Sequence, residues 1–447
     1  MSARLLTILA LAGFRLLAQE ALSLREAVDL ALHSNPLIAA ADAGEKEAEA
    51  GIHQAHSGYL PRLQFSESLQ RGNNPGFVFS SLLTQHQFSD ANFAIGSLNR
   101  PGAMNNYQSQ LTVEQLVFDA RQTSRSVEAA RFTRQMAGED TRRSHSDVIL
   151  NVLRAYFGVT LAEKNLGVAR QSLDSAREDL ERAESIYQSG RSTHADVLAL
   201  RVHLAAMQEQ QIRGSNDLAV ARAALNDALG VSLDRTFELT TPLDSSVDAP
   251  ECTFEEYRRL AAENRPEMRQ AALAQRLART QQQIAGAAYW PQVAIQGIVE
   301  ADRQNFFSKG GANWFTAVTL RWNLWNGGET KARVEQARFA ESRAEALRKR
   351  ADSGIHLEVL TAYLSLRAAA QRVEVAAAAA SEAEEAHRII QNRYQAGLIT
   401  VTELLRSEVT LAAVRSRRLA AIYDHRIAAA ALEHAAGRLA ADSPLVN

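Results

Sequence analysis

The 447-residue sequence has few of the residues that interrupt or cross-link a chain: one cysteine (Cys252), 9 prolines and 23 glycines. A single cysteine excludes an intrachain disulfide framework and any cysteine-rich metal site. The scarcity of helix-breaking residues, beside abundant alanine, leucine, arginine and glutamate, indicates long helices. A formal net charge of −2 gives no electrostatic reason to expect a nucleic-acid partner.

Long apolar runs are also scarce. One begins at Leu5, directly after Arg4, and Ala18 follows it as a small residue suited to cleavage. We therefore predict a signal peptide at residues 1–18, cleaved after Ala18 or Ala21, although an ordinary buried N-terminal helix would have the same pattern. No other run approaches the roughly 20 apolar residues of a membrane helix. If the mature protein spans a bilayer, it must do so with strands.

Motifs of catalysis and nucleotide binding are absent as well. The sequence has no GxGxxG after a strand, no GxxxxGK[ST], no HExxH and no GxSxG. His53 and His56 are three residues apart on an expected helix, but no third ligand is near them in sequence, so we interpret them as surface residues rather than a metal site. We expect no catalytic residue, no metal and no cofactor, and hence a protein that is not an enzyme.

The sequence contains an internal duplication. Early matches recur after 230 residues and later ones after 207: Pro36 with Pro266, Tyr59 with Tyr289, Pro61 with Pro291, Tyr156 with Tyr363, Tyr187 with Tyr394, Gly190 with Gly397, Thr193 with Thr400, and Gly230 with Gly437. Two constant registers over nearly the whole chain are not produced by chance matches of alanine. The sequence therefore predicts two structural repeats.

The predicted boundaries follow from these registers. The first repeat spans residues 19–230, with a helix, a strand pair at 61–118 and a long helical hairpin at 120–230. A linker at 231–253 carries Pro242 and Pro250. The second repeat spans residues 254–440, with a helix, a strand pair at 291–325 and a hairpin at 328–437.

The change of register places 23 extra residues in the first strand pair. The stretch from about Arg71 to Asn106 is rich in glycine, asparagine, serine and phenylalanine, and it has no helical period. We therefore expect a long loop that joins the two strands.

Apolar residues follow an unbroken 4-3 spacing through each long helix, from Val148 to Tyr187 and from Ile355 to Tyr394. This is a coiled-coil pattern, and its alternation of large residues with alanine lets neighbouring helices approach closely. A helix from about 120 to 188 would be roughly 100 Å long at 1.5 Å per residue, so it must pack lengthwise against other helices. The helices alone would equally suit a soluble coiled-coil scaffold.

The expected strands alternate apolar and polar residues. Trp314, Val318 and Trp322 share one face, opposite Thr319 and Arg321. This pattern is typical of a membrane barrel wall around a wet lumen, and also of a half-buried soluble sheet. The tryptophans favour the barrel. Trp314 and Trp322 are roughly 26 Å apart along a strand, which matches the aromatic girdles at the two edges of a bilayer; two aromatics in a sheet core are the alternative.

Four strands cannot close a barrel on their own. An open sheet edge in lipid leaves backbone groups unpaired, each at a cost of several kcal/mol, and the smallest single-chain barrels have about eight strands. The chain must therefore assemble with copies of itself, as a dimer or a trimer. In such a barrel the longer loop is expected to face outward at the mouth.

Two segments at the ends of the hairpins resemble a known family. They are YQSGRSTHADVL at 187–198 and YQAGLITVTELL at 394–405, and each resembles the tyrosine–glycine–threonine–acidic turn of the TolC-type outer-membrane efflux family. The order of elements in each copy resembles that family too: a short helix, a proline-led strand, a loop, a strand, an LVFDAR or LWNGGE junction, and a long helix pair. The resemblance covers roughly residues 22–440.

The resemblance implies a mainly α fold with a small antiparallel β part. It implies a homotrimer with a twelve-stranded β-barrel in outer-membrane lipid and an α-helical tunnel in the periplasm. The implied partners are a periplasmic adaptor protein and an inner-membrane efflux transporter, from which the duct passively conducts small molecules such as drugs and toxic compounds. An exit duct for type I protein secretion, and a periplasmic coiled-coil scaffold without a pore, remain the alternatives.

The resemblance also implies sites. Acidic residues after the tip turn line a narrowing of the tunnel entrance, and Asp196 and Glu403 occupy those positions. Arg406 and Ala199 stand one helical turn later, where a second acidic residue often follows, so a doubly acidic cation-binding ring is not expected. The turn residues are candidates for adaptor docking: Tyr187, Gly190, Thr193, Tyr394, Gly397 and Thr400.

Local chemistry gives these turn residues a simpler role as well. Gly190 and Gly397 suit the left-handed conformation that ends a helix. Thr193 and Thr400 each precede an acidic residue by three positions, which is the capping-box arrangement. The turn residues could therefore serve only to make a tight hairpin.

Overall fold

The structure is a computed structural model that describes residues 20–190, 192–244, 252–308 and 310–446. The signal peptide predicted at residues 1–18 lies outside the described residues, as does part of the predicted linker. The chain forms two compact units, and each combines segments of both repeats. The first unit consists of the described residues of Met1–Ala43, Glu139–Arg269 and Lys349–Asn447, and the second of Gly44–Gly138 and Gln270–Arg348.

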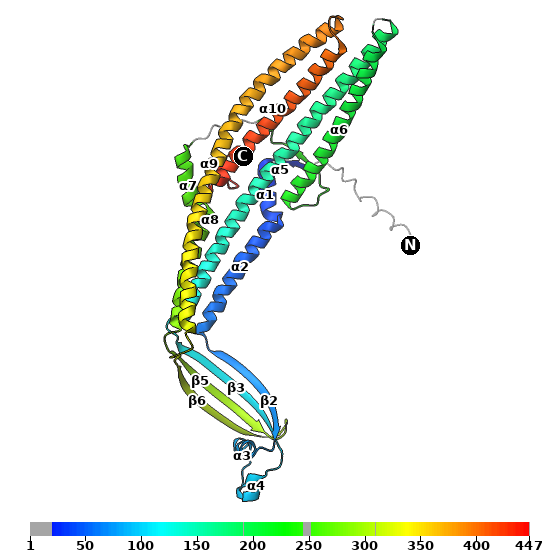
Figure 1. Cartoon of the computed structure of the whole chain (residues 1–447). Helices are drawn as coiled ribbons and strands as arrows, with labels where there is room; N and C mark the ends of the chain where they lie inside the picture. Colours follow the sequence, from blue (N-terminus) through cyan, green and yellow to red (C-terminus); the bar gives the residue numbers. More distant parts are fainter. Residues whose placement is uncertain (1–19, 191, 245–251, 309, 447) are drawn as a thin grey trace, which may run out of the picture. The chain divides into compact units, whose positions relative to one another are not determined.

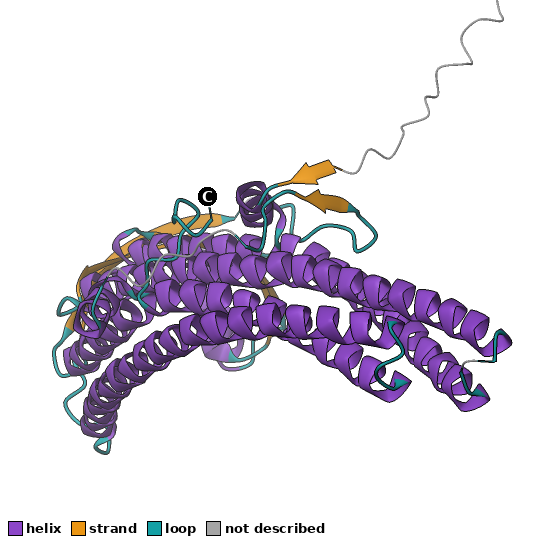
Figure 2. Ribbon diagram, turned by 90° about the horizontal axis from the view of Figure 1, so that it is seen from above, coloured by secondary structure: helices purple, strands orange, loops and turns teal. Residues whose placement is uncertain are grey.

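Two long helical hairpins form most of the first unit. Helix α5 (Gln122–Gln188) is followed by α6 (His194–Leu229), and α9 (Glu329–Gln395) by α10 (Val401–Ala435). Within the first unit the four helices lie side by side (Figures 1 and 2). The expected 4-3 spacing marks the faces that pack together, since these members of it are buried: Val148, Val152, Val159, Leu166, Ala169, Leu173, Ala176, Ala183, Ile355, Val359, Leu366, Ala369 and Ala380.

Short elements complete the first unit. They are α1 (Leu24–Ser34), the start of α2 (Pro36–His56), α7 (Phe254–Asn264), and a parallel pair of β1 (Glu20–Leu22) with β4 (Phe237–Leu239). Tyr156, fully buried on α5, ties this pair to the helices. Its hydroxyl donates to the carbonyl oxygen of Leu22 at 2.8 Å and accepts from the amide of Thr241 at 3.0 Å.

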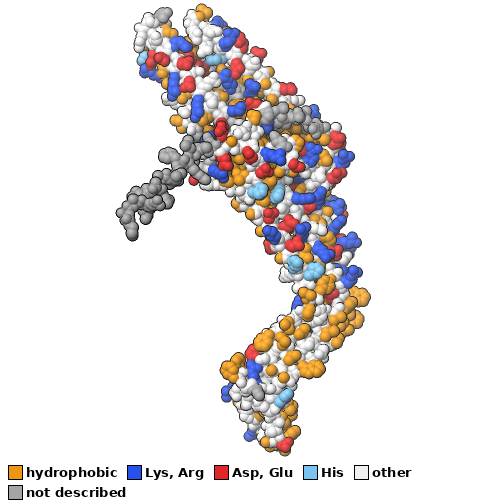
Figure 3. All heavy atoms as spheres, turned by 180° about the vertical axis from the view of Figure 1, so that it is seen from behind, with side chains coloured by type: hydrophobic (Ala, Val, Ile, Leu, Met, Phe, Trp, Pro, Cys, Tyr) orange, Lys and Arg blue, Asp and Glu red, His pale blue; other side chains and the backbone are white. Residues whose placement is uncertain are grey.

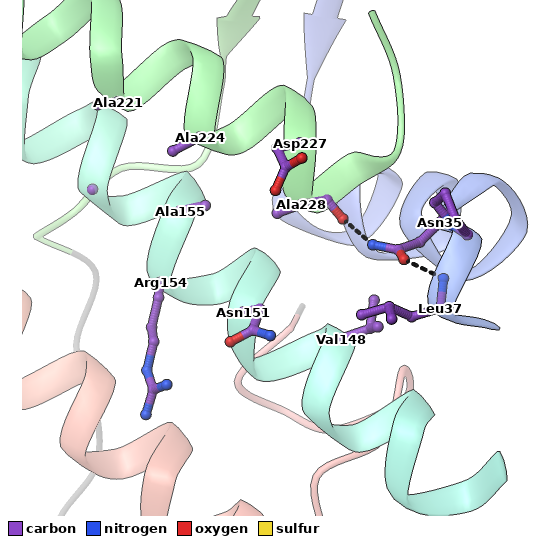
Figure 4. Close-up of a pocket in the computed structure, with 12 residues that line it drawn as sticks. Asn35, Leu37, Val148, Asn151, Arg154, Ala155, Ala221, Ala224, Asp227 and Ala228 are labelled. Carbon is purple, nitrogen blue, oxygen red and sulfur yellow. Dashed lines mark hydrogen bonds between the residues drawn. The ribbon is translucent and has the colours of Figure 1, made fainter. Parts of the chain in front are cut away.

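The two repeats attach their short helices to the last turns of the return helices. In the first repeat, the Asn35 side chain donates to the carbonyl oxygen of Ala228 at 2.8 Å, and its own oxygen accepts from the Leu37 amide at 2.9 Å (Figure 4). In the second repeat, the Arg265 guanidinium donates to the carbonyl oxygen of His434 at 3.2 Å. Both contacts satisfy carbonyl groups at a helix C-terminus, which lack partners within the helix.

An antiparallel sheet forms the centre of the second unit. Its strands are β2 (Arg62–Gly72), β3 (Met104–Phe118), β5 (Gln292–Arg303) and β6 (Gly311–Arg321), in the order β2-β3-β5-β6. The central pair, β3 with β5, joins the two repeats, and β2 and β6 are the edges. The 3-10 turn η1 (Ser57–Tyr59), most of α2, α8 (Pro266–Ala287) and the first parts of α5 and α9 complete this unit.

The expectation of a loop without helices between β2 and β3 was wrong. This stretch contains α3 (Pro75–Thr84), the 3-10 turn η2 (Asp90–Phe93) and α4 (Ile95–Asn99). The Asn74 side chain caps α3 by accepting from the amides of Gly76 and Phe77 at 3.0 and 3.3 Å, and Pro75 occupies the first helical position. The start of the expected loop is thus the start of a helix, and a ten-residue helix is too short to show a clear period.

The fold class is confirmed: the described chain is mainly helical, with four antiparallel strands in its main sheet. Among the described helices, none combines the length and apolarity needed to cross a bilayer.

Candidate functional site

The first tip turn, between α5 and α6, has the geometry expected from its sequence. Gly190 adopts a left-handed conformation with φ of +76°. Thr193 then caps α6, because its hydroxyl accepts from the Asp196 amide at 3.2 Å while the Asp196 carboxylate accepts from the Thr193 amide at 3.2 Å and from its hydroxyl at 2.7 Å. The Ser192 hydroxyl also donates to this carboxylate at 3.1 Å. These hydrogen bonds, chiefly the one from the Thr193 hydroxyl, lower the pKa of Asp196.

The second tip turn, between α9 and α10, resembles the first only in part. Gly397 is again left-handed, with φ of +71°, and the amide of Leu398 donates to the carbonyl oxygen of Arg393 at 2.9 Å. Thr400 precedes α10, but its side chain makes no capping hydrogen bond, so the expected capping box with Glu403 was wrong. The Glu403 amide donates to the backbone carbonyl oxygen of Thr400 at 3.2 Å, which satisfies it without the hydroxyl.

The three residues expected at the tunnel entrance therefore differ in their surroundings. Asp196 is held in the capping box, whereas Glu403 and Arg406 are exposed on α10. Glu403 thus keeps its carboxylate available to solvent, while Asp196 stabilises the start of a helix.

The turn residues also differ in exposure. Tyr187 is exposed and its ring lies 5.6 Å from that of His194. Tyr394 is half-buried in a cluster that joins the two hairpins, around the buried side chains of Ala183, Leu200 and Val401. This packed layer lies next to both turns in sequence, so it fixes the helix ends from which the turns project.

A buried group of ionisable side chains lies next to this layer, and the sequence reasoning missed it. It brings together Asp179 on α5, His203 on α6 and Glu408 on α10, whose side chains are 2%, 8% and 9% exposed. The Nε2 atom of His203 lies 2.9 Å from Oε2 of Glu408, which is an ion-pair distance, although the alignment is too poor for a hydrogen bond. Asp179 accepts from the Arg182 guanidinium at 3.0 Å, and the Glu408 carboxyl lies close enough to affect its protonation.

Burial is the main cause of the unusual protonation in this cluster. It raises the pKa of Asp179 to about 7, and the adjacent carboxylate of Glu408 acts in the same direction. Burial also raises the pKa of Glu408, but its interactions with His203 and Asp179 outweigh this effect, so that the pKa of Glu408 falls below its usual range. Below about pH 7 the pair of carboxylates therefore carries one proton, held chiefly by Asp179. Glu408 could have been suspected from the sequence, because it continues the spacing of the buried residues Val401, Leu404 and Leu411.

The sheet of the second unit has one apolar and one polar face. The register places Phe65, Leu111, Val299 and Trp314 in one row across four strands, and all four side chains are exposed. The neighbouring row on the other face contains Ser66, Gln110, Glu300 and Asn313. Figure 3 shows hydrophobic side chains gathered over the strands, whereas charged side chains are spread over the helices.

The two expected interface tryptophans lie at different places along this sheet. Trp314 is on β6 and is 77% exposed. Trp322 follows the last residue of β6, and its indole Nε1 donates to the carbonyl oxygen of Tyr289 at 3.1 Å. An amphipathic ring with its polar atom satisfied suits a membrane–water interface.

No group of three or more His, Cys, Asp or Glu side chains among the described residues could hold a metal ion. His53 and His56 lie in the last turn of α2, on the second unit. The candidate sites are thus the pair of polar tip turns in the first unit and the exposed apolar strand face in the second.

Comparison with known proteins agrees with this geometry. The family model "Outer membrane efflux protein" matches residues 27–231 and 258–438, one match in each repeat. Protein CyaE of Bordetella pertussis is 26% identical over 423 residues, which cover 94% of this chain and 84% of that protein. The alkaline protease secretion protein AprF of Pseudomonas aeruginosa is 26% identical over 343 residues, 73% of this chain and 66% of that protein.

Among solved structures, the Campylobacter jejuni CmeC outer membrane channel superposes with a TM-score of 0.80 at 15% identity, over 94% of this chain and 87% of that chain. This similarity concerns the fold, and the family match concerns the sequence of both repeats. The chain therefore belongs to the TolC family of outer membrane efflux proteins, and it is a non-enzymatic outer-membrane channel with a periplasmic helical tunnel and a β-barrel.

Proposed function

We propose that three copies of this chain form the exit duct of an export assembly, with twelve strands closing one barrel in outer-membrane lipid. The observation that carries this proposal is the sheet itself. Its edges, β2 and β6, have no partner strand within the described chain, and one of its faces exposes large apolar side chains. Pairing of β2 with β6 of the next copy would satisfy both edges, and lipid would cover the apolar face.

The first prediction tests this assembly. Protein purified in mild detergent should have the mass of three chains, because a four-stranded sheet with open edges is unstable in lipid. The mass is measured by light scattering with the detergent contribution subtracted. A stable monomer in detergent would contradict the barrel, and a protein that stays in solution without detergent would favour a periplasmic scaffold.

The partners proposed at the tip turns are a periplasmic adaptor and, through it, an inner-membrane transporter. The tip turns supply the docking surface, with Tyr187, Gly190 and Thr193 on one hairpin and Tyr394, Gly397 and Thr400 on the other. In support, a Cβ added at Gly190 or Gly397 would meet no atom within 4 Å. The turns therefore have open space beside their backbone, into which a partner side chain fits.

The exported cargo is the finer part of the proposal. The sequence alone favoured small toxic compounds over proteins. The similarity to a protein named for secretion of an alkaline protease now gives an exported polypeptide the stronger support, and small toxic compounds become the second candidate. A strain that lacks this chain distinguishes them. Loss of specific proteins from the culture medium with unchanged drug susceptibility supports polypeptide export, and the reverse result supports small-molecule efflux.

The second prediction concerns the tunnel entrance, where we propose that Glu403 and Arg406, with Asp196, form the narrowing. Glu403→Gln should reduce the cation preference of single channels, because it removes an exposed carboxylate without changing its shape. Asp196→Asn should act in the same direction, because it also removes a carboxylate of the narrowing, and it should in addition weaken the cap of α6 by about 1 kcal/mol, since this carboxylate is engaged in the capping box. Glu209→Gln, on the exposed part of α6 in an ion pair with Arg213, is the matched control and should leave cation preference unchanged. Equal cation preference in wild type and Glu403→Gln would remove Glu403 from the narrowing.

A further inference from the structure

The extra residues of the first repeat contain a segment that returns to the sheet. Helix α3 ends at Thr84, and residues Thr84, Gln85 and His86 then lie against the ends of β3, β5 and β6. We name these three residues the mouth strap. They lie at the end of the sheet where β2 passes to α3, which is opposite to the end that connects to the long helices (Figure 1).

Gln85 anchors the mouth strap to the first repeat's own strand. Its side chain is 2% exposed, and its Nε2 donates to the carbonyl oxygen of Asn105 at 3.0 Å and to Oδ1 of Asn106 at 2.8 Å. Asn106 in turn donates through Nδ2 to Oδ1 of Asp302 at 2.6 Å. Asp302, on β5, is 1% exposed. A continuous chain of hydrogen bonds therefore links the strap to strands of both repeats.

The other two residues of the mouth strap, Thr84 and His86, contact β6. The Asn313 side chain donates through Nδ2 to the carbonyl oxygen of Thr84 at 3.0 Å, and its Oδ1 lies 3.2 Å from Nε2 of His86. The approach is so close that a Cβ added at Gly311 would overlap the Thr84 carbonyl oxygen. Glycine at this position is thus required by the contact itself.

These contacts are all made on the polar face of the sheet. Asn106, Asp302 and Asn313 alternate along their strands with Tyr107, Arg303 and Trp314, and Trp314 belongs to the apolar face. In a barrel with lipid outside, the opposite, polar face lines the lumen. The mouth strap therefore occupies the lumen side of the wall, although the surrounding extra residues belong to a loop that connects two strands.

Hydrophobic packing contributes only part of the attachment of this segment. Val78 on α3 is buried and Leu82 is half-buried, whereas Phe79 and Leu83 remain exposed. The mouth strap itself is held by amide side chains and one carboxylate, which are groups that remain compatible with a water-filled channel.

We propose that the mouth strap narrows the outer mouth of the channel and sets the size of the molecules that pass it. The inference rests on the proposed function, because a lumen exists only in the closed barrel. One strap from each of three subunits enters the lumen at the same level, so their effects on its width add together.

The experiment measures the width of each end of the channel separately. Channels are inserted in one orientation into planar bilayers, and neutral polyethylene glycols of graded size are added to either side. A polymer small enough to enter lowers the conductance, and one that is excluded does not. In one variant residues 75–102 are replaced by a short glycine–serine linker, which the pairing of Gly72 with Met104 permits. A second variant, Gln85→Ala with Asn313→Ala, removes two anchors of the strap. Asn99→Ala, on the exposed part of α4, is the matched control.

In both strap variants the size cutoff on the loop side should shift to larger polymers, while the cutoff on the helix side stays constant. The control should match wild type on both sides. An unchanged loop-side cutoff in channels that otherwise conduct normally overturns the role of the mouth strap and leaves the duct intact. Absence of channels in the wild-type protein overturns the proposed function and the strap with it. The trimer mass of each variant shows that the fold is preserved.

Discussion

Gly230→Ala is expected to destabilise the first helical hairpin by about 3 kcal/mol, whereas Gly190→Ala is expected to cost about 1 kcal/mol. The two glycines share a left-handed backbone, with φ of +72° and +76°. Their surroundings differ. A Cβ at Gly230 would lie 2.6 Å from the carbonyl oxygen of Ser34 and 2.7 Å from the Cα atom of Asn35, and a Cβ at Gly190 would meet nothing within 4 Å.

The comparison therefore separates backbone strain from steric overlap. Both variants carry the strain of a left-handed alanine, but only Gly230→Ala must also displace the backbone at the end of α1. Displacement of that backbone would disturb the Asn35 side chain, which donates to the carbonyl oxygen of Ala228. We expect the overlap to add at least as much destabilisation as the strain.

The measurement is the thermal midpoint of the helical circular dichroism signal of the trimer. Midpoints are compared rather than free energies, because a large assembly does not unfold in two states. Gly437→Ala serves as a second arm, since a Cβ there would lie 2.9 Å from the amide nitrogen of Arg265 in the second repeat. Similar midpoints for Gly230→Ala and Gly190→Ala would show that the backbone at the end of α1 moves at little cost, and would contradict the expected steric penalty at Gly230.

Features that repeat along the chain could be predicted from the sequence. The duplication, the 4-3 spacing and the alternation of Trp314 and Val318 with polar residues each rest on many positions. Helix α5 accordingly begins at Gln122 and ends at Gln188, within about two residues of the expected bounds. The left-handed glycines at the tips were predictable for another reason, because Gly190 and Gly397 depend only on their local backbone.

Features that depend on a contact between residues far apart in the sequence could not be predicted. Asp179 and Glu408 are 229 positions apart, and nothing near either residue indicates that one of them keeps a proton. The mouth strap is similar, since Gln85 meets Asn106 and Asp302 only after the sheet has formed. The capping box predicted at the second tip turn does not form. Thr400 and Glu403 have suitable spacing, but the Thr400 hydroxyl makes no capping hydrogen bond, although the backbone hydrogen bond between the two residues is the same as in the first turn.

The buried carboxylates beneath the tip should make the packing of the two hairpins depend on pH. In the packed state burial raises the pKa of Asp179 to about 7, so this residue keeps a proton that a separated, hydrated Asp179 would lose near its ordinary value of 3.8. The packed state therefore binds more protons than the separated state between about pH 4 and pH 7. Its stability falls as the pH rises through that range and is constant above it, because both states are then deprotonated.

Some of the groups that face this pair of carboxylates raise the pKa of Asp179 and others lower it. Arg182 on α5 opposes the rise in the pKa of Asp179. The Nε2 atom of His203 on α6 lies 2.9 Å from Oε2 of Glu408. Glu178 on α5 acts on Asp179 in the same direction as burial. His387 and Tyr394 on α9 and Arg415 on α10 also face the pair, and burial lowers the pKa of His387. The pKa of Glu408 shifts in the opposite direction from that of Asp179. We therefore expect the stability of the packed state to change by roughly 3 kcal/mol, which is less than the shift of Asp179 alone would give.

Hydrogen exchange at the ends of α5 and α10 measures this change directly. Amide protection there, corrected for the intrinsic pH dependence of exchange, should fall by up to about a hundredfold between pH 5 and pH 8 in the wild-type trimer. Asp179→Asn should abolish this dependence and protect the tip at pH 8. Its amide donates to Glu408 and accepts from Arg182 without a second negative charge. Asp174→Asn is the matched control, because Asp174 lies on the same helix in an exposed ion pair with Arg177 at 3.1 Å. If protection at the tip is the same at both pH values, or if Asp174→Asn changes it as much as Asp179→Asn, the proton on Asp179 does not hold the hairpins together.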